Sequence, residues 1–266
     1  MDLSIVIPVS GRSNYLDRCL ETILRQESLR GAIAAEVIVV DNAAISELSD
    51  ATKLACESAR RRHSQAKITL KYIRARHSKA SHRNASYPLN VGIKLSRGHV
   101  VLITAADVLH VSDTLGQHLH SHDQVPKLML FSFCRDCPAD IALDPQALRT
   151  AIKDERHQLR MASWTDWYGG MCCSIKREHL LAVGGFEEKF YRWGYEDYDL
   201  ARRLQLISVS VVRDDNILTL HQAHPSSGES GWPMKAYAGV RQLLRIRRAN
   251  RCRSWGQVTT QPCLIE

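Results

Sequence analysis

No run of apolar residues in this 266-residue sequence approaches the roughly 18 that a membrane-spanning helix requires. The start of the sequence also lacks the pattern of a signal peptide, because Asp2 precedes a short apolar run that ends at Pro8. These two absences predict a cytoplasmic protein without a span across the bilayer.

The eight cysteines lack the regular spacing of a disulfide framework. Cys134 and Cys137 form a CxxC pair, yet no second pair stands at the spacing of a zinc site. The sequence therefore predicts reduced thiols, with this pair in a loop, and a reducing compartment.

Concentrated basic charge is scarce, although the formal net charge is +8. Nucleotide phosphates, acidic lipid and nucleic acid would each satisfy such a charge. The basic residues are scattered except at 235–253, where interleaved apolar residues fit an amphipathic helix. We expect no nucleic-acid partner. The tail is interpreted either as a peripheral contact with the inner face of a membrane or as a terminal helix packed on the domain.

Strand and helix patterns alternate along most of the chain, and an apolar content of 44% is enough for a sizeable core. Short β-branched runs predict strands buried on both faces, and apolar residues at helical spacing follow them. The fold class is therefore α/β. The predicted strands are 3–9, 36–41, 68–73, 100–104, 128–133, 171–175, 209–212 and 217–220. The predicted helices are 14–24, 46–62, 89–98, 145–159, 177–183 and one that begins at Glu196.

Candidate ligand-binding residues follow predicted strands. Asp41 ends the second strand, at the edge where open α/β sheets bind ligands. Asp107 stands just past the fourth strand, well placed to hold a divalent metal against a diphosphate, and capping of a turn is the alternative. His221 and His224, three apart in a predicted loop, can share one metal. In a chain with 12 histidines the alternative is a pair of surface histidines.

The stretch YRWGYEDYDL at 191–200 combines carboxylates with aromatic rings. Glu196 and Asp197 fall in the first turn of the predicted helix, where free N–H groups favour ionised carboxylates. Aromatic faces beside fixed carboxylates suit a sugar, and such a carboxylate can take a proton from a hydroxyl. An acidic helix start with core aromatics is the alternative, but Trp193 and Gly194 just before the acids favour a functional site.

Two loops are further candidates for ligand contact. Trp167 and Tyr168 precede Gly169 and Gly170, and a glycine pair allows close approach of the backbone to a ligand. The polar segment 226–232 is interpreted as a lid over a site.

Taken in order, these motifs resemble the metal-dependent glycosyltransferases of the GT-A fold, family 2, over roughly residues 3–232. The resemblance implies an α/β fold with a mixed central sheet and helices on both faces. The generic part is SIVIPVSGRSNYLDRCLETIL and EVIVVDNAAIS. The specific part is YGGMCCSIKREHLLAVGGFEEKFYRWGYEDYDLARRL followed by HQAHP, which is similar to the C-terminal region of galactosyltransferase-type members. These include β-1,4-galactosyltransferases and bacterial chondroitin-type polymerases.

The resemblance implies a role for each candidate residue. Asp197 is the catalytic base, and Trp193, Gly194 and Glu196 bind the acceptor. The implied donor contacts are Pro8, Val9, Arg12, Asp41, Arg83, Asp107, Trp167, Tyr168, Gly169 and Gly170. The implied metal ligands are Asp107, His221 and His224, and the ion is Mn²⁺ or Mg²⁺. One departure affects the donor end: the family's Asp-x-Asp motif reads Ala105-Ala106-Asp107 here, so its first acid is absent.

The implied activity is inverting transfer of a hexose or N-acetylhexosamine from a UDP-sugar to a glycan or glycolipid hydroxyl, in bacterial surface polysaccharide synthesis. A catalytically silent module that binds a sugar nucleotide or glycan is the alternative. The expected organisation is one catalytic domain at 1–232, whose nucleotide-sugar half is 1–110 and whose acceptor half is 111–232. A basic helical extension at 233–266 follows.

Overall fold

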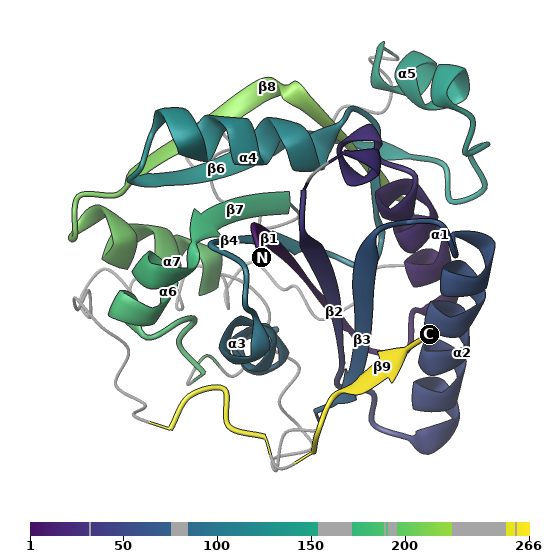
Figure 1. Cartoon of the computed structure of the whole chain (residues 1–266), viewed down its shortest axis with the longest axis horizontal. Helices are drawn as coiled ribbons and strands as arrows, with labels where there is room; N and C mark the ends of the chain where they lie inside the picture. The colour runs from purple at the N-terminus through teal and green to yellow at the C-terminus, as the bar shows by residue number, and fades with distance from the viewer. Residues whose placement is uncertain are drawn as a thin grey trace, which may run out of the picture.

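A nine-stranded mixed sheet runs through the molecule (Figure 1). This computed structural model describes residues 1–31, 33–75, 85–153, 172–188, 190, 196–224, 254–258 and 260–266. The strands are β1 (Leu3–Val9), β2 (Ala35–Asp41), β3 (Ile68–Arg74), β4 (Val100–Thr104), β5 (Val108–His110), β6 (Leu128–Cys137), β7 (Cys172–Lys176), β8 (Ser210–Gln222) and β9 (Cys263–Ile265). Their order across the sheet is β5-β8-β6-β7-β4-β1-β2-β3-β9.

Helices cover both faces of this sheet, as the sequence predicts (Figure 1). Alternate residues of β1 show why: Ile5 and Ile7 face a core shared with α1 and α2, whereas Val6 faces a core shared with α3, α6 and α7. The helices are α1 (Ser13–Leu24), α2 (Ser46–Arg62), α3 (Ser86–Leu95), α4 (Thr114–Gln124), α5 (Pro145–Lys153), α6 (Arg177–Val183) and α7 (Glu196–Gln205), with a 3₁₀ turn η1 (Glu27–Arg30).

The central strands β4, β1, β2 and β3 are parallel, so their carboxyl ends share one edge of the sheet. Val9 at the end of β1 pairs with Asp41 at the end of β2. β7 joins β4 in the antiparallel direction, with Cys172 opposite Thr104. The carboxyl ends of β1, β2 and β4 therefore lie at the same edge of the sheet as the start of β7.

Several predicted elements have the bounds found in the structure. β1, β4 and α6 match their predictions, and α7 begins at Glu196. Gly184 ends α6 with a left-handed φ of 75°, a conformation that glycine adopts without a Cβ penalty. The predicted helix at 89–98 lies at Ser86–Leu95 instead, because Pro88 sits in its first turn and Ser96 is extended.

The predictions around β6 and β8 were wrong in two respects. The predicted strands 209–212 and 217–220 are one strand, β8, which continues through a bulge where Ser132 and Phe133 of β6 shift register. β6 is longer than predicted, so Cys134 and Cys137 lie in a strand and not in a loop. Neither Cys134 nor Cys137 forms a disulfide bond. The cause is long-range pairing: β8 runs beside β6 as far as Cys137 and supplies backbone partners where the apolar pattern has already stopped.

The last residues of the chain rejoin the sheet. β9 pairs with β3 in the antiparallel direction, and Trp255 is buried in the core that includes α3 and α6. The sequence placed these residues in a helical extension, because a three-residue strand carries too little periodicity to be predicted. The boundary at residue 232 and the helix at 235–253 stay predictions. In the described part of the chain, no helix is long and apolar enough to span a membrane.

Candidate functional site

Asp107 is the centre of a charged cluster at the carboxyl edge of the sheet. Its backbone follows β4, and its side chain is only 6% exposed. Arg12, just before α1, donates a charge-assisted hydrogen bond to Oδ2 of Asp107. Nε2 of His224 lies 3.2 Å from the same oxygen, and Nε2 of His221 lies 3.9 Å from Oδ1. Residues that are distant in the sequence thus converge on one carboxylate.

The end of β8 holds the two histidines in place. The backbone N–H of Gln222 donates to the carbonyl of Asp107 at 2.9 Å, so strand β8 is tied to the Asp107 segment. The Gln222 side chain accepts a hydrogen bond from Nε of Arg18 at 2.7 Å, which ties the same residue to α1. The His224 ring meets the Tyr15 ring edge-on, with centroids 6.0 Å apart. The prediction that both histidines lie in a loop was wrong for His221, which is within β8.

A single cation fits this donor set. The ligand atoms of Asp107, His221 and His224 all lie within 4.8 Å of one another. Ligands about 2.1 Å from a shared ion stand about 3–4 Å apart, so only small shifts would close the set around one ion. One carboxylate with two imidazoles suits divalent transition metals, Mn²⁺ among them. The side chains of Asp107, His221 and His224 therefore fit the divalent cation that the family resemblance implies.

The end of β2 is arranged differently. Asp41 is fully buried, and its two oxygens already accept hydrogen bonds from the backbone N–H of Ala43 at 2.8 Å and from the hydroxyl of Tyr72 at 2.9 Å. Burial and the Asp41 carboxylate raise the pKa of that hydroxyl, so Tyr72 is a stable donor. Asp41 therefore orders the turn after β2. Pro8 and Val9 lie beside it at the end of β1.

One carboxylate of α7, that of Asp197, lies near strand β7. Burial raises the pKa of the Cys173 thiol, and the negative charge of Asp197 raises it further, which places Asp197 close to the start of β7. Cys173 pairs with Ile103, next to the end of β4. Asp197 is partly exposed, and Glu196 is buried. The first turn of α7 contains Glu196, Asp197 and Asp199, of which Asp197 and Asp199 are partly exposed.

A buried arginine fixes the position of α7. Nη1 of Arg203 donates to the carbonyls of Val183 and Gly185, each at 2.7 Å, and Nε donates to Asp199 at 2.7 Å. Burial raises the pKa of Asp199, and the Arg203 charge opposes this shift. Arg203 carries no distinguishing signal in the sequence, because a basic residue near the end of a helix is usually exposed to solvent.

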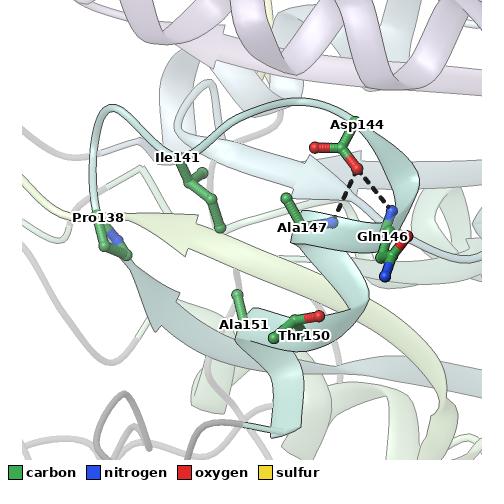
Figure 2. Close-up of a pocket in the computed structure, with 7 residues that line it drawn as sticks. All are labelled: Pro138, Ile141, Asp144, Gln146, Ala147, Thr150 and Ala151. Carbon is green, nitrogen blue, oxygen red and sulfur yellow. Dashed lines mark hydrogen bonds between the residues drawn. The ribbon is translucent and has the colours of Figure 1, made fainter.

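A second feature, a pocket of about 510 Å³, lies between α5 and the loop that precedes it and is shown in Figure 2. Ile141 and Ala147 line it, and Asp144 accepts hydrogen bonds from two backbone N–H groups at the start of the helix. Among the predicted site residues that the structure describes, none lines this pocket, so it is separate from the Asp107 cluster.

Some predicted site residues lie outside the described residues. They are Arg83, Trp167, Tyr168, Gly169, Gly170, Trp193 and Gly194. The segments 226–232 and 235–253 lie outside as well. Their roles stay predictions.

Comparison with known proteins assigns this chain to a family. The model of "Glycosyl transferase family 2" matches residues 4–184, more than half of the chain. A second model, "N-terminal domain of galactosyltransferase", matches residues 152–224, which include α7 and both histidines. Both agree with the resemblance inferred from the sequence motifs.

Among curated proteins, the chain is 22% identical to "Uncharacterized glycosyltransferase YfnE" of Bacillus subtilis, over 86% of this chain and 67% of that protein. It is 31% identical to human chondroitin sulfate synthase 3, over only 28% of this chain and 8% of that protein.

Two solved structures show the same fold. The mannosyltransferase PcManGT from Pyrobaculum calidifontis, in complex with GDP-Man and Mn²⁺, aligns with a TM-score of 0.61 and 21% identity, over 90% of this chain and 62% of that one. TarS 1-349 of S. aureus in complex with UDP-GlcNAc aligns with a TM-score of 0.58 and 15% identity, over 92% of this chain and 67% of that one. The chain thus spans about two thirds of these proteins. The fold is GT-A, and the chain belongs to glycosyl transferase family 2.

Proposed function

We propose that the protein transfers a hexose or N-acetylhexosamine from a UDP-sugar to a hydroxyl group of a glycan or glycolipid, with inversion at the anomeric carbon. The observation that carries this proposal is the cluster of Asp107, His221 and His224 at the carboxyl edge of the sheet, in a chain of glycosyl transferase family 2. Ligands of open α/β sheets bind at this edge.

At the donor end, Asp107, His221 and His224 would hold Mn²⁺ or Mg²⁺. When bound, such an ion stabilises the charge of the departing diphosphate as a Lewis acid. Arg12 stands beside Asp107 with a side chain that is 39% exposed, so it can turn from the carboxylate to a phosphate oxygen. The TarS complex with UDP-GlcNAc supports a UDP-sugar, and the complex of the Pyrobaculum enzyme supports Mn²⁺.

At the acceptor end, Asp197 would take the proton of the acceptor hydroxyl. The hydroxyl oxygen forms a bond to the anomeric carbon while the bond from that carbon to the diphosphate oxygen breaks. The proton remains on Asp197, and the bonding electrons leave with the diphosphate. Attack from the face opposite the leaving group inverts the anomeric configuration. Glu196, buried next to Asp197, would hold the acceptor together with Trp193 and Gly194.

The remaining assignments follow the family resemblance. Arg83 would contact the diphosphate, and the loop with Trp167, Tyr168, Gly169 and Gly170 would shape the pocket for the donor sugar. We further propose a role in bacterial surface polysaccharide synthesis, with peripheral membrane contact through 235–253. The relatives in which a glycan role is named, such as chondroitin sulfate synthase 3, support a glycan acceptor.

A catalytically silent module is the second candidate, because Ala105 replaces the first acid of the usual Asp-x-Asp motif. One experiment separates the two functions: UDP release from a panel of UDP-sugars is measured with Mn²⁺, with and without glycan acceptors. Turnover that depends on the sugar and is lost in Asp197→Asn would support the transferase. Tight binding of a UDP-sugar without turnover under any of these conditions would support the silent module.

A further inference from the structure

Asp136 contacts the side of His221 that faces away from the metal site. The two residues lie opposite each other in the parallel pairing of β6 and β8. Nδ1 of His221 lies 2.6 Å from Oδ1 of Asp136, a short charge-assisted hydrogen bond. Because an ionised carboxylate can only accept, Nδ1 must carry the proton in this contact.

The protonation of Nδ1 decides what the other ring nitrogen can do. A neutral imidazole carries one N–H, so a proton on Nδ1 leaves Nε2 with a free lone pair. Nε2 is the atom that faces Asp107, 3.9 Å from Oδ1. The other neutral tautomer would point an N–H at the same place and would exclude a cation from it.

We propose that Asp136 is a positioning residue, which fixes the tautomer and ring plane of His221 so that Nε2 presents its lone pair to a divalent cation held with Asp107 and His224. The inference rests on the metal site of the proposed function. Histidines that bind metals commonly donate their second ring N–H to a carboxylate, and loss of that partner typically costs about 10–100-fold in metal affinity. Asp136 belongs to the CxxC stretch Cys134-Arg135-Asp136-Cys137, so the inference also gives this stretch a role beside its thiols.

The contact geometry indicates that Asp136 acts through His221. The group of ligand atoms that lie within 4.8 Å of one another consists of Asp107, His221 and His224. Asp136 binds the far side of the His221 ring, and its own side chain is 40% exposed. His224 meets the His221 ring edge-on, with centroids 5.1 Å apart, but it also has neighbours of its own, the ring of Tyr15 and the guanidinium of Arg12 at 3.0 Å. Removal of Asp136 should therefore disturb one ligand of the set and leave the other two in place.

The test is a double-mutant cycle read out by Mn²⁺ affinity in the presence of UDP, measured by electron paramagnetic resonance. Asp136→Ala should lower the affinity by about 10–100-fold. Asp136→Asn should lower it less, because an amide accepts as well as donates and so permits both tautomers. In a His221→Ala background, Asp136→Ala should have no further effect. Asp140→Ala, at the next acid along the chain and exposed, is the control for the change of charge and should leave the affinity unchanged.

A second readout does not depend on the metal. Nitrogen chemical shifts of the His221 ring in the metal-free protein should report a proton on Nδ1, and Asp136→Ala should move the proton toward Nε2. Additive losses in the double mutant, or a tautomer that Asp136→Ala leaves unchanged, would overturn the role of Asp136. If His221→Ala keeps full Mn²⁺ affinity while the tautomer still responds to Asp136, the proposed metal site fails instead.

Discussion

Nε2 of His224 lies 3.2 Å from Oδ2 of Asp107. Asp107 follows β4, and His224 follows β8. Arg12 stands close to both, 3.0 Å from Nε2 of His224. The two side chains therefore form one unit, and substitutions at either should have the same consequence.

His224→Ala should weaken Mn²⁺-dependent UDP binding and lower turnover together. The expected loss of UDP affinity is about tenfold or more, which corresponds to about 1.4 kcal/mol. Asp107→Ala should behave in the same way, and added Mn²⁺ should partly restore His224→Ala because the other ligands remain. Calorimetric titration of UDP at fixed Mn²⁺ measures the effect. UDP affinity that stays at the wild-type level in both variants would remove these residues from the donor site.

Asp197→Asn should separate chemistry from donor binding. The amide keeps the shape of the side chain but is no base, so turnover should fall by roughly 10²–10⁴-fold. UDP and Mn²⁺ should bind nearly as before, because this carboxylate is assigned to the acceptor. Asp199→Asn is a poor control, since Asp199 pairs with the buried Arg203. Asp215→Asn, at an exposed acid of β8, is the matched control. If Asp197→Asn abolishes Mn²⁺-dependent UDP binding while His224→Ala leaves it intact, the assigned roles are reversed.

Three histidines buried near α4 should make the protein less stable in mild acid. Burial lowers the pKa of His110 to about 4, of His118 to about 3 and of His122 to about 4. The unfolded chain binds protons at these residues below about pH 6.5, whereas the folded protein does not. Their contribution to stability is therefore complete above pH 6.5 and is lost as the pH falls toward 4. The slope approaches about 1.4 kcal/mol per pH unit for each histidine.

The measurement is the free energy of unfolding in urea at pH 7, 6 and 5. His118→Gln should reduce the pH dependence, since it removes one titrating group while glutamine can still hydrogen-bond to Ser132 or Ser174. His120→Gln, on the same helix but exposed, should leave the pH dependence unchanged. Identical slopes for both variants would show that the buried histidines do not cause the acid sensitivity.

The sequence predicts the features that depend on local patterns of residues. It does not predict the features that depend on contacts between segments that are distant in the chain. β1, β4 and the start of α7 carry strong periodicity, and the rule that ligands bind at strand ends selects Asp107. Asp136 could not be predicted as a site residue, because the apolar pattern of β6 stops before it. Only the pairing with β8 extends the strand and brings Asp136 to His221. The role of Arg203 could not be predicted for a similar reason, since its partners are backbone carbonyls of α6 and of the turn after it. The sequence does not reveal contacts of this kind.

Substitutions at Asp41 can separate its structural role in the folded protein from its predicted role in nucleotide binding. Asp41→Ala removes the acceptor of the Tyr72 hydroxyl and of the Ala43 N–H, both in buried surroundings. The free energy of unfolding should fall by about 1–3 kcal/mol, the usual penalty for a buried polar group without its partner. Tyr72→Phe is the matched control, because it removes the same hydroxyl contact but keeps the carboxylate and its bond to Ala43.

UDP affinity then decides the second role of Asp41. If the carboxylate also reads uracil, Asp41→Ala should weaken UDP binding by about 1–3 kcal/mol while Tyr72→Phe leaves it nearly unchanged. Denaturant curves and calorimetry on the two variants give both quantities. A carboxylate that is fully buried and already holds two protein donors has an ordering role without any ligand. UDP affinity at the wild-type level in both variants would therefore confine Asp41 to that ordering role and leave the nucleotide base to Pro8 and Val9.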